Sequence, residues 1–410
     1  MILNYIWVTF FLLAFVVALI KLIAFGDVEV FPAMLNSTFD MAKTGFELSL
    51  YLTGVMSLWL GIMKIGEKGG VVKILAKLVG PFFSRLFPGV PDNHPATGAI
   101  IMNFSANMLG LDNAATPLGL KAMKEMQELN TDKETASDAQ IMFLALNTSG
   151  FTIIPIAIIL DRSILGAANP TDIFIPTLIA TSVSTLAAMF VVSIYQRINL
   201  IDKVFLSYLL GFSALIVGAV YYFISLPQEA LTVQSNLISS IIIITIIISF
   251  LLLGLYKKLP LYETFVEGAK EGFEISIKII PYLIAILVAI GMFRSSGTLN
   301  YVTEGIGWGF AAMGFNTDFV DALPVALLKP LSGGAAKGMM VETVKTFGPD
   351  SFTGRLASIL RGCTETTFYI LAVYFGSVNI RRTRYALTVG LIADLVGVIA
   401  GILVAYLFFH

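Results

Sequence analysis

Long apolar runs alternate with short polar loops along the whole chain. The runs cover residues 4–25, 46–64, 141–160, 173–195, 204–226, 236–256, 274–293, 356–376 and 386–409. A helix needs about 20 mainly apolar residues to cross roughly 30 Å of hydrocarbon, so each run predicts a transmembrane helix. The pattern therefore predicts an all-α polytopic membrane protein with about nine transmembrane helices.

Two further apolar stretches are interrupted by polar and helix-breaking residues. Residues 97–118 contain several Asn residues and a proline, and residues 320–341 contain Pro330 followed by a pair of glycines. Such stretches make poor continuous helices, and we expect two re-entrant or broken helices. Between them and the apolar runs, Val71 to Leu86 is basic and amphipathic.

The chain contains an internal repeat. Ala42-Lys-Thr-Gly-Phe-Glu-Leu-Ser-Leu50 returns as Ala269-Lys-Glu-Gly-Phe-Glu-Ile-Ser-Ile277, an offset of 227 residues that also places Gly70 on Gly297 and Ser105 on Ser332. Each half then has four apolar runs and one broken helix, while the run at 204–226 has no counterpart. One extra crossing turns the second half upside down. We therefore expect residues 1–200 and 231–410 to be inverted repeats joined by a linker helix within 201–230.

Basic residues gather in alternate loops. They follow the second, fourth, sixth and eighth runs, with Lys68, Arg197, Lys257 and Arg382 among them. The positive-inside rule then predicts that the N-terminus lies inside and the C-terminus outside.

Composition restricts the class of protein. The chain is 57% hydrophobic and 13% charged, with a net charge of −1, which disfavours a soluble enzyme and a nucleic-acid partner. Its single cysteine, Cys363, and its histidines, His94 and His410, form no cluster of soft metal ligands, so no metal or other cofactor is expected. Phosphate-loop and HExxH motifs are missing, and no histidine within a run could activate a serine; we therefore expect a protein that is not an enzyme.

Broken helices in a membrane are tolerated where protein or a watery cavity satisfies their backbone, so they mark candidate sites. Polar residues gather in both broken stretches and in the apolar runs that follow them. The candidate substrate-binding residues are Asn103, Ser105, Asn107, Asn113, Asn147, Thr148, Ser149, Lys329, Ser332, Gly333, Gly334, Lys337, Thr364, Glu365, Thr366 and Thr367. The two lysines favour an anion. Glu47, Glu274 and Arg361 are candidates for ion coupling.

Each group has an alternative interpretation. The Asn and Ser clusters could form caps and turns, and Arg361 could pair with Glu365, four residues later, only to fix helix packing. Glu47 and Glu274 could favour the start of a helix. The two lysines could extend to the membrane interface.

Several motifs resemble known families. Ser57-Leu-Trp-Leu-Gly-Ile-Met-Lys-Ile-Gly-Glu67 and Met102-Asn-Phe-Ser-Ala-Asn-Met-Leu-Gly-Leu-Asp-Asn113 resemble spore maturation protein A. Lys329-Pro-Leu-Ser-Gly333 and Thr364-Glu-Thr-Thr-Phe-Tyr-Ile-Leu371 resemble spore maturation protein B. The resemblance implies a fusion of A-like (1–200) and B-like (231–410) gate, or nucleoside recognition, domains in a bacterial cytoplasmic membrane. The chain departs from the family pattern at Lys329, Ala336 and Lys337, and in being one chain where spore formers usually have two proteins.

These features lead to two hypotheses. The first is a transporter or channel-like protein that moves a small polar or anionic solute, or an ion, through a midplane site between the repeats. The second is a membrane scaffold, or an accessory protein of envelope or spore maturation, whose polar residues only hold helices together. The expected partners are the lipid bilayer and the solute. The oligomeric state stays open, a homo-oligomer included.

Overall fold

The computed structural model describes residues 2–91, 94–110, 112–153, 155–198 and 202–410, and within these ranges the chain is helical, with one isolated extended bridge between Thr135 and Arg382. The first half contains α1 (Ile2–Phe25), α2 (Val30–Gly69), α3 (Val71–Leu86), α4 (Pro95–Met108), α5 (Asp112–Leu129), α6 (Asp138–Ser149), α7 (Ile156–Ile164) and α8 (Phe174–Gln196). A lone helix, α9 (Lys203–Ile224), follows. The expected all-α class is confirmed.

The second half repeats this order of helices. It contains α10 (Gln228–Tyr256), α11 (Leu261–Ser295), α12 (Thr298–Ala312), the short η1 (Val320–Ala322) and α13 (Leu323–Leu328), α14 (Gly333–Phe347), α15 (Phe352–Gly362), α16 (Thr367–Ser377) and α17 (Ala386–Phe409). α3 and α12 begin 227 residues apart, each after a glycine with a positive φ, Gly70 at 94° and Gly297 at 83°. η1 and α13 together take the place of α4, and α9 has no counterpart.

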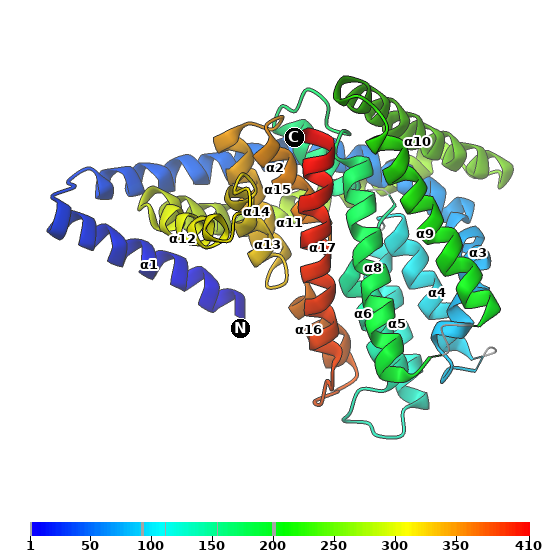
Figure 1. Ribbon diagram of the computed structural model, residues 1–410. Coiled ribbons are helices and arrows are strands. Elements are labelled where there is room, and N and C mark those ends of the chain that lie inside the picture. The colour runs from blue at the N-terminus through cyan, green and yellow to red at the C-terminus, as the bar shows by residue number, and fades with distance from the viewer. Residues whose placement is uncertain (1, 92–93, 111, 154, 199–201) are drawn as a thin grey trace.

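Equivalent helices of the two repeats run in opposite directions. α2 and α11 lie side by side and are antiparallel. Gly45 of α2 lies against Ile284 of α11, whereas Met56, later in α2, lies against Gly272, earlier in α11. α8 and α17 are also antiparallel, because Ser184 donates to the Ala393 carbonyl (2.9 Å) while Tyr195, further along α8, stacks on Tyr385 at the start of α17 (Figure 1). Repeats related in this way are inverted.

The two predicted broken stretches are interrupted as expected. α4 and α5 form a hairpin, since Asn103 Nδ2 reaches the carbonyl oxygen of Ala115 at 2.8 Å, which a straight helix would place about 18 Å away. In the second repeat the chain turns at residues 329–332, between α13 and α14.

Two predicted continuous spans are also interrupted, which corrects the sequence analysis. The run at 141–160 is divided between α6 and α7, and the run at 356–376 between α15 and α16. Gly150, with a φ of 65°, ends α6, and Pro155 precedes α7. By length and composition, three helices of the described chain could each cross a membrane alone: Trp7–Phe25, Phe174–Gln196 and Ala386–Phe409.

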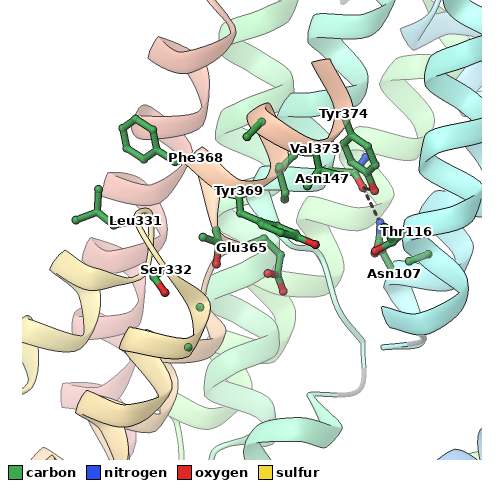
Figure 2. A pocket seen from close by; sticks show the side chains of 16 residues that line it. Asn107, Thr116, Asn147, Leu331, Ser332, Glu365, Phe368, Tyr369, Val373 and Tyr374 are labelled. Atoms are coloured by element: carbon green, nitrogen blue, oxygen red, sulfur yellow. Dashed lines mark hydrogen bonds between the residues drawn. The ribbon is translucent and has the colours of Figure 1, made fainter. Parts of the chain in front are cut away.

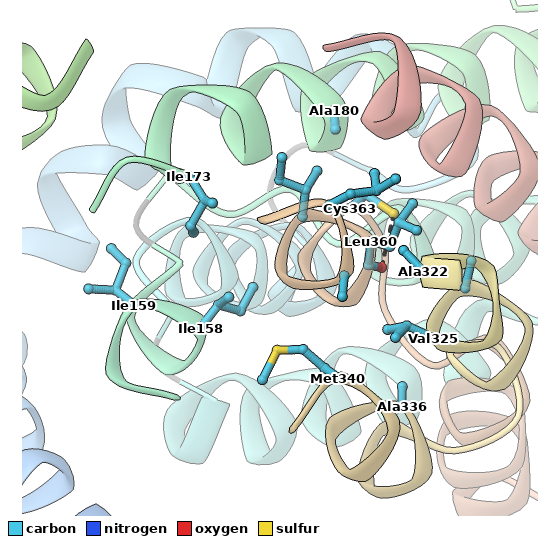
Figure 3. Close-up of a cluster of buried hydrophobic side chains, with 14 of the residues drawn as sticks. Ile158, Ile159, Ile173, Ala180, Ala322, Val325, Ala336, Met340, Leu360 and Cys363 are labelled. Atoms are coloured by element: carbon cyan, nitrogen blue, oxygen red, sulfur yellow. Dashed lines mark hydrogen bonds between the residues drawn. The ribbon is translucent and has the colours of Figure 1, made fainter. Parts of the chain in front are cut away.

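An apolar core surrounds these interruptions (Figure 3). It joins α7 and α8 of the first repeat to α13, α14 and α15 of the second through Ile158, Val325, Met340 and Leu360. Cys363 lies in it, fully buried. Both repeats therefore contribute to this core.

Ion pairs that include contacts between the two repeats lie at both ends of this bundle. At one end Arg382 pairs with Asp132 (3.2 Å), and a hydrogen bond from Thr135 lowers the pKa of Asp132, which favours its charged form. At the other end, near the C-terminus, Asp172 binds the buried Arg162 (2.9 Å) and Arg355 (2.7 Å).

The seam between α2 and α11 gives a stability prediction. A Cβ on Gly268 would collide with the carbonyl oxygen of Leu60, whereas one on Gly54 would meet nothing within 4 Å. We expect Gly268→Ala to destabilise the protein by about 1–3 kcal/mol. The matched control Gly54→Ala should be neutral or stabilising by up to about 1 kcal/mol. Thermal unfolding of the two purified variants in detergent checks this, and equal midpoints would contradict the proposed seam.

Candidate functional site

A cavity of about 770 Å³ lies where the interrupted helices of the two repeats meet (Figure 2). The first repeat contributes α4, α5 and α6, and the second contributes the start of α14, the α15–α16 break and α16. Its lining residues are Asn107, Ala115, Thr116, Asn147, Leu331, Ser332, Gly333, Gly334, Glu365, Thr366, Phe368, Tyr369, Ile370, Ala372, Val373 and Tyr374. Seven candidates from the sequence therefore lie together: Asn107, Asn147, Ser332, Gly333, Gly334, Glu365 and Thr366.

The two helix breaks cross each other beside this cavity. The Glu365 amide of the second break donates to the Thr148 carbonyl of the first at 2.9 Å. Each break is also tied to the hairpin of its own repeat, through Ile153 N to Met108 O (2.7 Å) and Phe368 N to Pro330 O (3.0 Å). Main-chain groups that the interruptions would otherwise leave unpaired are satisfied by one another.

A chain of amides forms one wall of the cavity. Asn107 donates to Asn147 Oδ1 at 2.9 Å, and Asn147 Nδ2 donates to the Phe143 carbonyl at 2.8 Å. The buried Asn103 accepts a longer bond from Asn107 (3.4 Å) and holds the hairpin instead of lining the cavity. The wall thus consists of amides whose positions are fixed by neighbours.

The opposite wall combines a helix start with aromatic rings. Ser332 caps α14 by accepting from the Ala335 amide (3.2 Å), so the capping alternative holds for this residue. Figure 2 shows Tyr369 and Glu365 between Ser332 on one side and Asn107 on the other. Tyr369 is 58% exposed. A solute here would meet ring faces, hydroxyls and amides.

The alternative interpretation in which Arg361 pairs with Glu365 is wrong. α15 ends at Gly362, so the two residues do not share a helical face. Arg361 instead binds Asp161 of α7 (2.9 Å), which also binds Lys337 (2.8 Å). Glu365 faces Lys329 at 3.6 Å.

Both lysines are therefore paired inside the protein. Their side chains are 10% and 15% exposed, so neither extends to an interface, and neither lines the cavity.

The remaining candidates lie outside the cavity lining. Thr148 and Ser149 bond to carbonyls of their own helix, at 3.1 and 3.0 Å, while Ser105, Thr364 and Thr367 are buried. Glu47 and Glu274 lie inside the long helices α2 and α11, so they do not begin helices, and both are exposed. The side chain of Asn113 lies outside the described residues.

Three features of this region were not predicted from the sequence. Asp161 and Asp394 are buried carboxylates, 3% and 4% exposed, in apolar helices. An acidic residue in an apolar run is a functional signal that could have identified Asp394, which lies within residues 386–409, whereas Asp161 directly follows the run at 141–160. The aromatic residues Phe368, Tyr369 and Tyr374 carried no such signal, because aromatic residues are common in membrane helices.

Comparison with known proteins identifies the family. A family model described as nucleoside recognition matches residues 49–162 and 276–381, more than half of the chain. The chain belongs to the nucleoside recognition, or gate, family. The two matched segments begin 227 residues apart, the offset of the internal repeat, and together they contain every residue that lines the cavity.

Two relatives of this gate-family chain come from Bacillus subtilis (strain 168). Spore maturation protein B is 50% identical over 174 residues, which is 42% of this chain and 96% of that protein. Spore maturation protein A is 44% identical over 156 residues, which is 38% of this chain and 80% of that protein. No solved structure matches the chain. The resemblance to both families is confirmed, while the assignment of residues 1–200 and 231–410 to them stays a prediction.

The cluster around Asp161 gives a second stability prediction. Asp161→Asn would leave Lys337 and Arg361 without their shared counter-ion in the interior, and removing one partner of a buried pair costs about 3–5 kcal/mol. Asp132→Asn is the matched control, because its pair with Arg382 is exposed, and it should change little. Thermal unfolding in detergent measures both. Equal unfolding temperatures would show that the Asp161 cluster contributes nothing beyond a surface pair.

Proposed function

We propose that this chain is a membrane transporter or channel-like protein for a small, uncharged, polar solute with a planar ring, of about nucleoside size. The observation that carries the proposal is the cavity between the two inverted repeats, lined from both at the crossing of their helix breaks. Secondary transporters commonly bind their solutes at such interfaces. A volume of about 770 Å³ lies within the usual range of small-molecule sites.

The lining chemistry supports an uncharged solute. Tyr369 and Tyr374 offer ring faces, while Asn107, Asn147 and Thr366 offer hydrogen-bonding groups. Glu365 is the charged residue among the described lining residues, and its partner is Lys329. An anion would approach this carboxylate with no unpaired lysine to offset the repulsion, so the proposal departs from the anion expected from sequence.

Binding of tritiated uridine to the purified protein tests this proposal. We expect saturable binding that Asn107→Ala and Asn147→Ala each weaken roughly 3- to 10-fold, the value of one hydrogen bond. Asn300→Ala, an exposed amide on α12, is the matched control and should bind as the wild type does. Absence of saturable binding of uridine, inosine and their bases would favour the scaffold hypothesis. Stronger binding of a pyridine dicarboxylate would favour an anion.

We further propose that the protein lies in the bacterial cytoplasmic membrane with its N-terminus inside and its C-terminus outside. The loop that contains Arg381, Arg382 and Arg384 lies at the opposite end of α17 from the C-terminus, in agreement with the positive-inside rule. Because the native Cys363 is buried, the labelling of a single introduced cysteine can be measured without a contribution from Cys363. Lys133→Cys should react with an impermeant reagent only from inside, and Asn316→Cys only from outside. The reverse pattern would contradict the orientation.

A further inference from the structure

One carboxylate lies within the apolar helix α17. Asp394 is 4% exposed, and its Oδ2 accepts a hydrogen bond of 2.6 Å from the Thr367 hydroxyl. Its other oxygen, Oδ1, is buried without a hydrogen-bond partner among the described residues. A charged carboxylate with an unsatisfied oxygen is costly in a low-dielectric interior, so this group requires a proton or a bound cation.

The charged side chains near Asp394 do not neutralise its carboxylate. Its electrostatic neighbours are Lys329 and Glu365, with the thiol of Cys363 nearby. Lys329 lies 3.6 Å from Glu365, so these two charges already offset each other.

The other ionisable side chains described on the helices packed against α17 are paired, stacked, in the cavity lining or exposed. Arg361 of α15 binds Asp161, and Asp138 of α6 binds Arg384. Tyr195 of α8 stacks on Tyr385, Arg355 of α15 binds Asp172, Tyr369 and Tyr374 of α16 line the cavity, and Tyr256 of α10 is exposed.

A proton fits this environment better than a metal ion. Among the described residues, the side-chain hydroxyls next to the Asp394 carboxylate are those of Thr367 and Thr364. Hard cations such as Ca²⁺ take about six to eight oxygen ligands. A single proton on Oδ1, by contrast, neutralises the carboxyl group without further ligands.

Asp394 is also connected to the cavity. Its hydrogen-bond partner Thr367 is the first residue of α16 and lies between Thr366 and Phe368, which both line the cavity. Thr367 follows directly on the break whose amide at Glu365 binds the first repeat. A change of charge at Asp394 therefore acts on the segment that joins the two repeats beside the solute.

We propose that Asp394 is a reversible proton-binding site that couples the occupancy of the cavity to the proton concentration. A proton from water adds to Oδ1 to give the neutral carboxylic acid, and its release restores the carboxylate; no other bond changes. The coupling rests on the proposed function, whereas proton binding does not.

Infrared difference spectroscopy of the purified full-length protein tests proton binding without any solute. Spectra recorded between mildly acidic and alkaline pH should show the C=O stretch of a buried carboxylic acid, and Asp394→Asn should abolish it. Asp138→Asn, which removes an exposed carboxylate, should retain the band. If Asp394→Asn fails to fold, Thr367→Val should move the midpoint of the band instead. An unchanged band in the Asp394 variant, or its loss when NaCl replaces choline chloride at fixed pH, would overturn the proposal.

Uridine binding measured over the same pH range tests the coupling. Affinity should change by up to about tenfold per pH unit where the wild-type band titrates, the slope for one linked proton, and stay flat in Asp394→Asn. A band without pH-dependent binding would overturn the coupling and leave the proton site. A band without any uridine binding would show instead that the proposed solute is wrong.

Discussion

The structure depends on the rule that backbone hydrogen-bonding groups inside a membrane must find partners within the protein. A continuous helix satisfies this rule by itself, because its backbone groups bond within the helix. Here both repeats contain a hairpin and a break. The bond from Glu365 N to Thr148 O joins one break to the other, and each break is bonded to its own hairpin. The backbone groups exposed by one interruption are therefore satisfied by another. The cavity lies where these interrupted segments meet instead of packing as continuous helices.

The inverted repeat supplies the scaffold that holds this crossing. Glycines at equivalent positions, Gly45 and Gly272, allow α2 and α11 to pack closely along their length. Charges across the repeats add a second set of contacts, with Asp161 of the first repeat bound to Lys337 and Arg361 of the second. Because buried ion pairs are costly to separate, these contacts favour one arrangement of the two repeats over sliding alternatives.

The repeat could be predicted from sequence because polar and glycine positions recur at a fixed offset, with Gly70 and Gly297 directly preceding the equivalent helices α3 and α12. The second pair of breaks was not predicted, although residues 147–150 and 361–367 are polar, because polar side chains also occur in continuous membrane helices that pack against other helices. The missed break also explains the wrong partner for Arg361, since the rule that pairs residues four apart holds only within one helix. The polar clusters of the sequence identified the amides and hydroxyls of the cavity. The aromatic wall and the buried Asp161 needed the tertiary structure, whereas Asp394 could have been identified from its position in an apolar run.

In the proposed mechanism, solute binds between the inverted repeats at the crossing of their breaks. A cryo-electron microscopy map of the full-length protein in lipid nanodiscs, recorded with and without uridine, would show the bound solute. We expect added density between Tyr369 and Asn107, in contact with both repeats, and retained contact between Thr148 and Glu365. A cavity filled by side chains, or uridine density at another place in the protein, would contradict it.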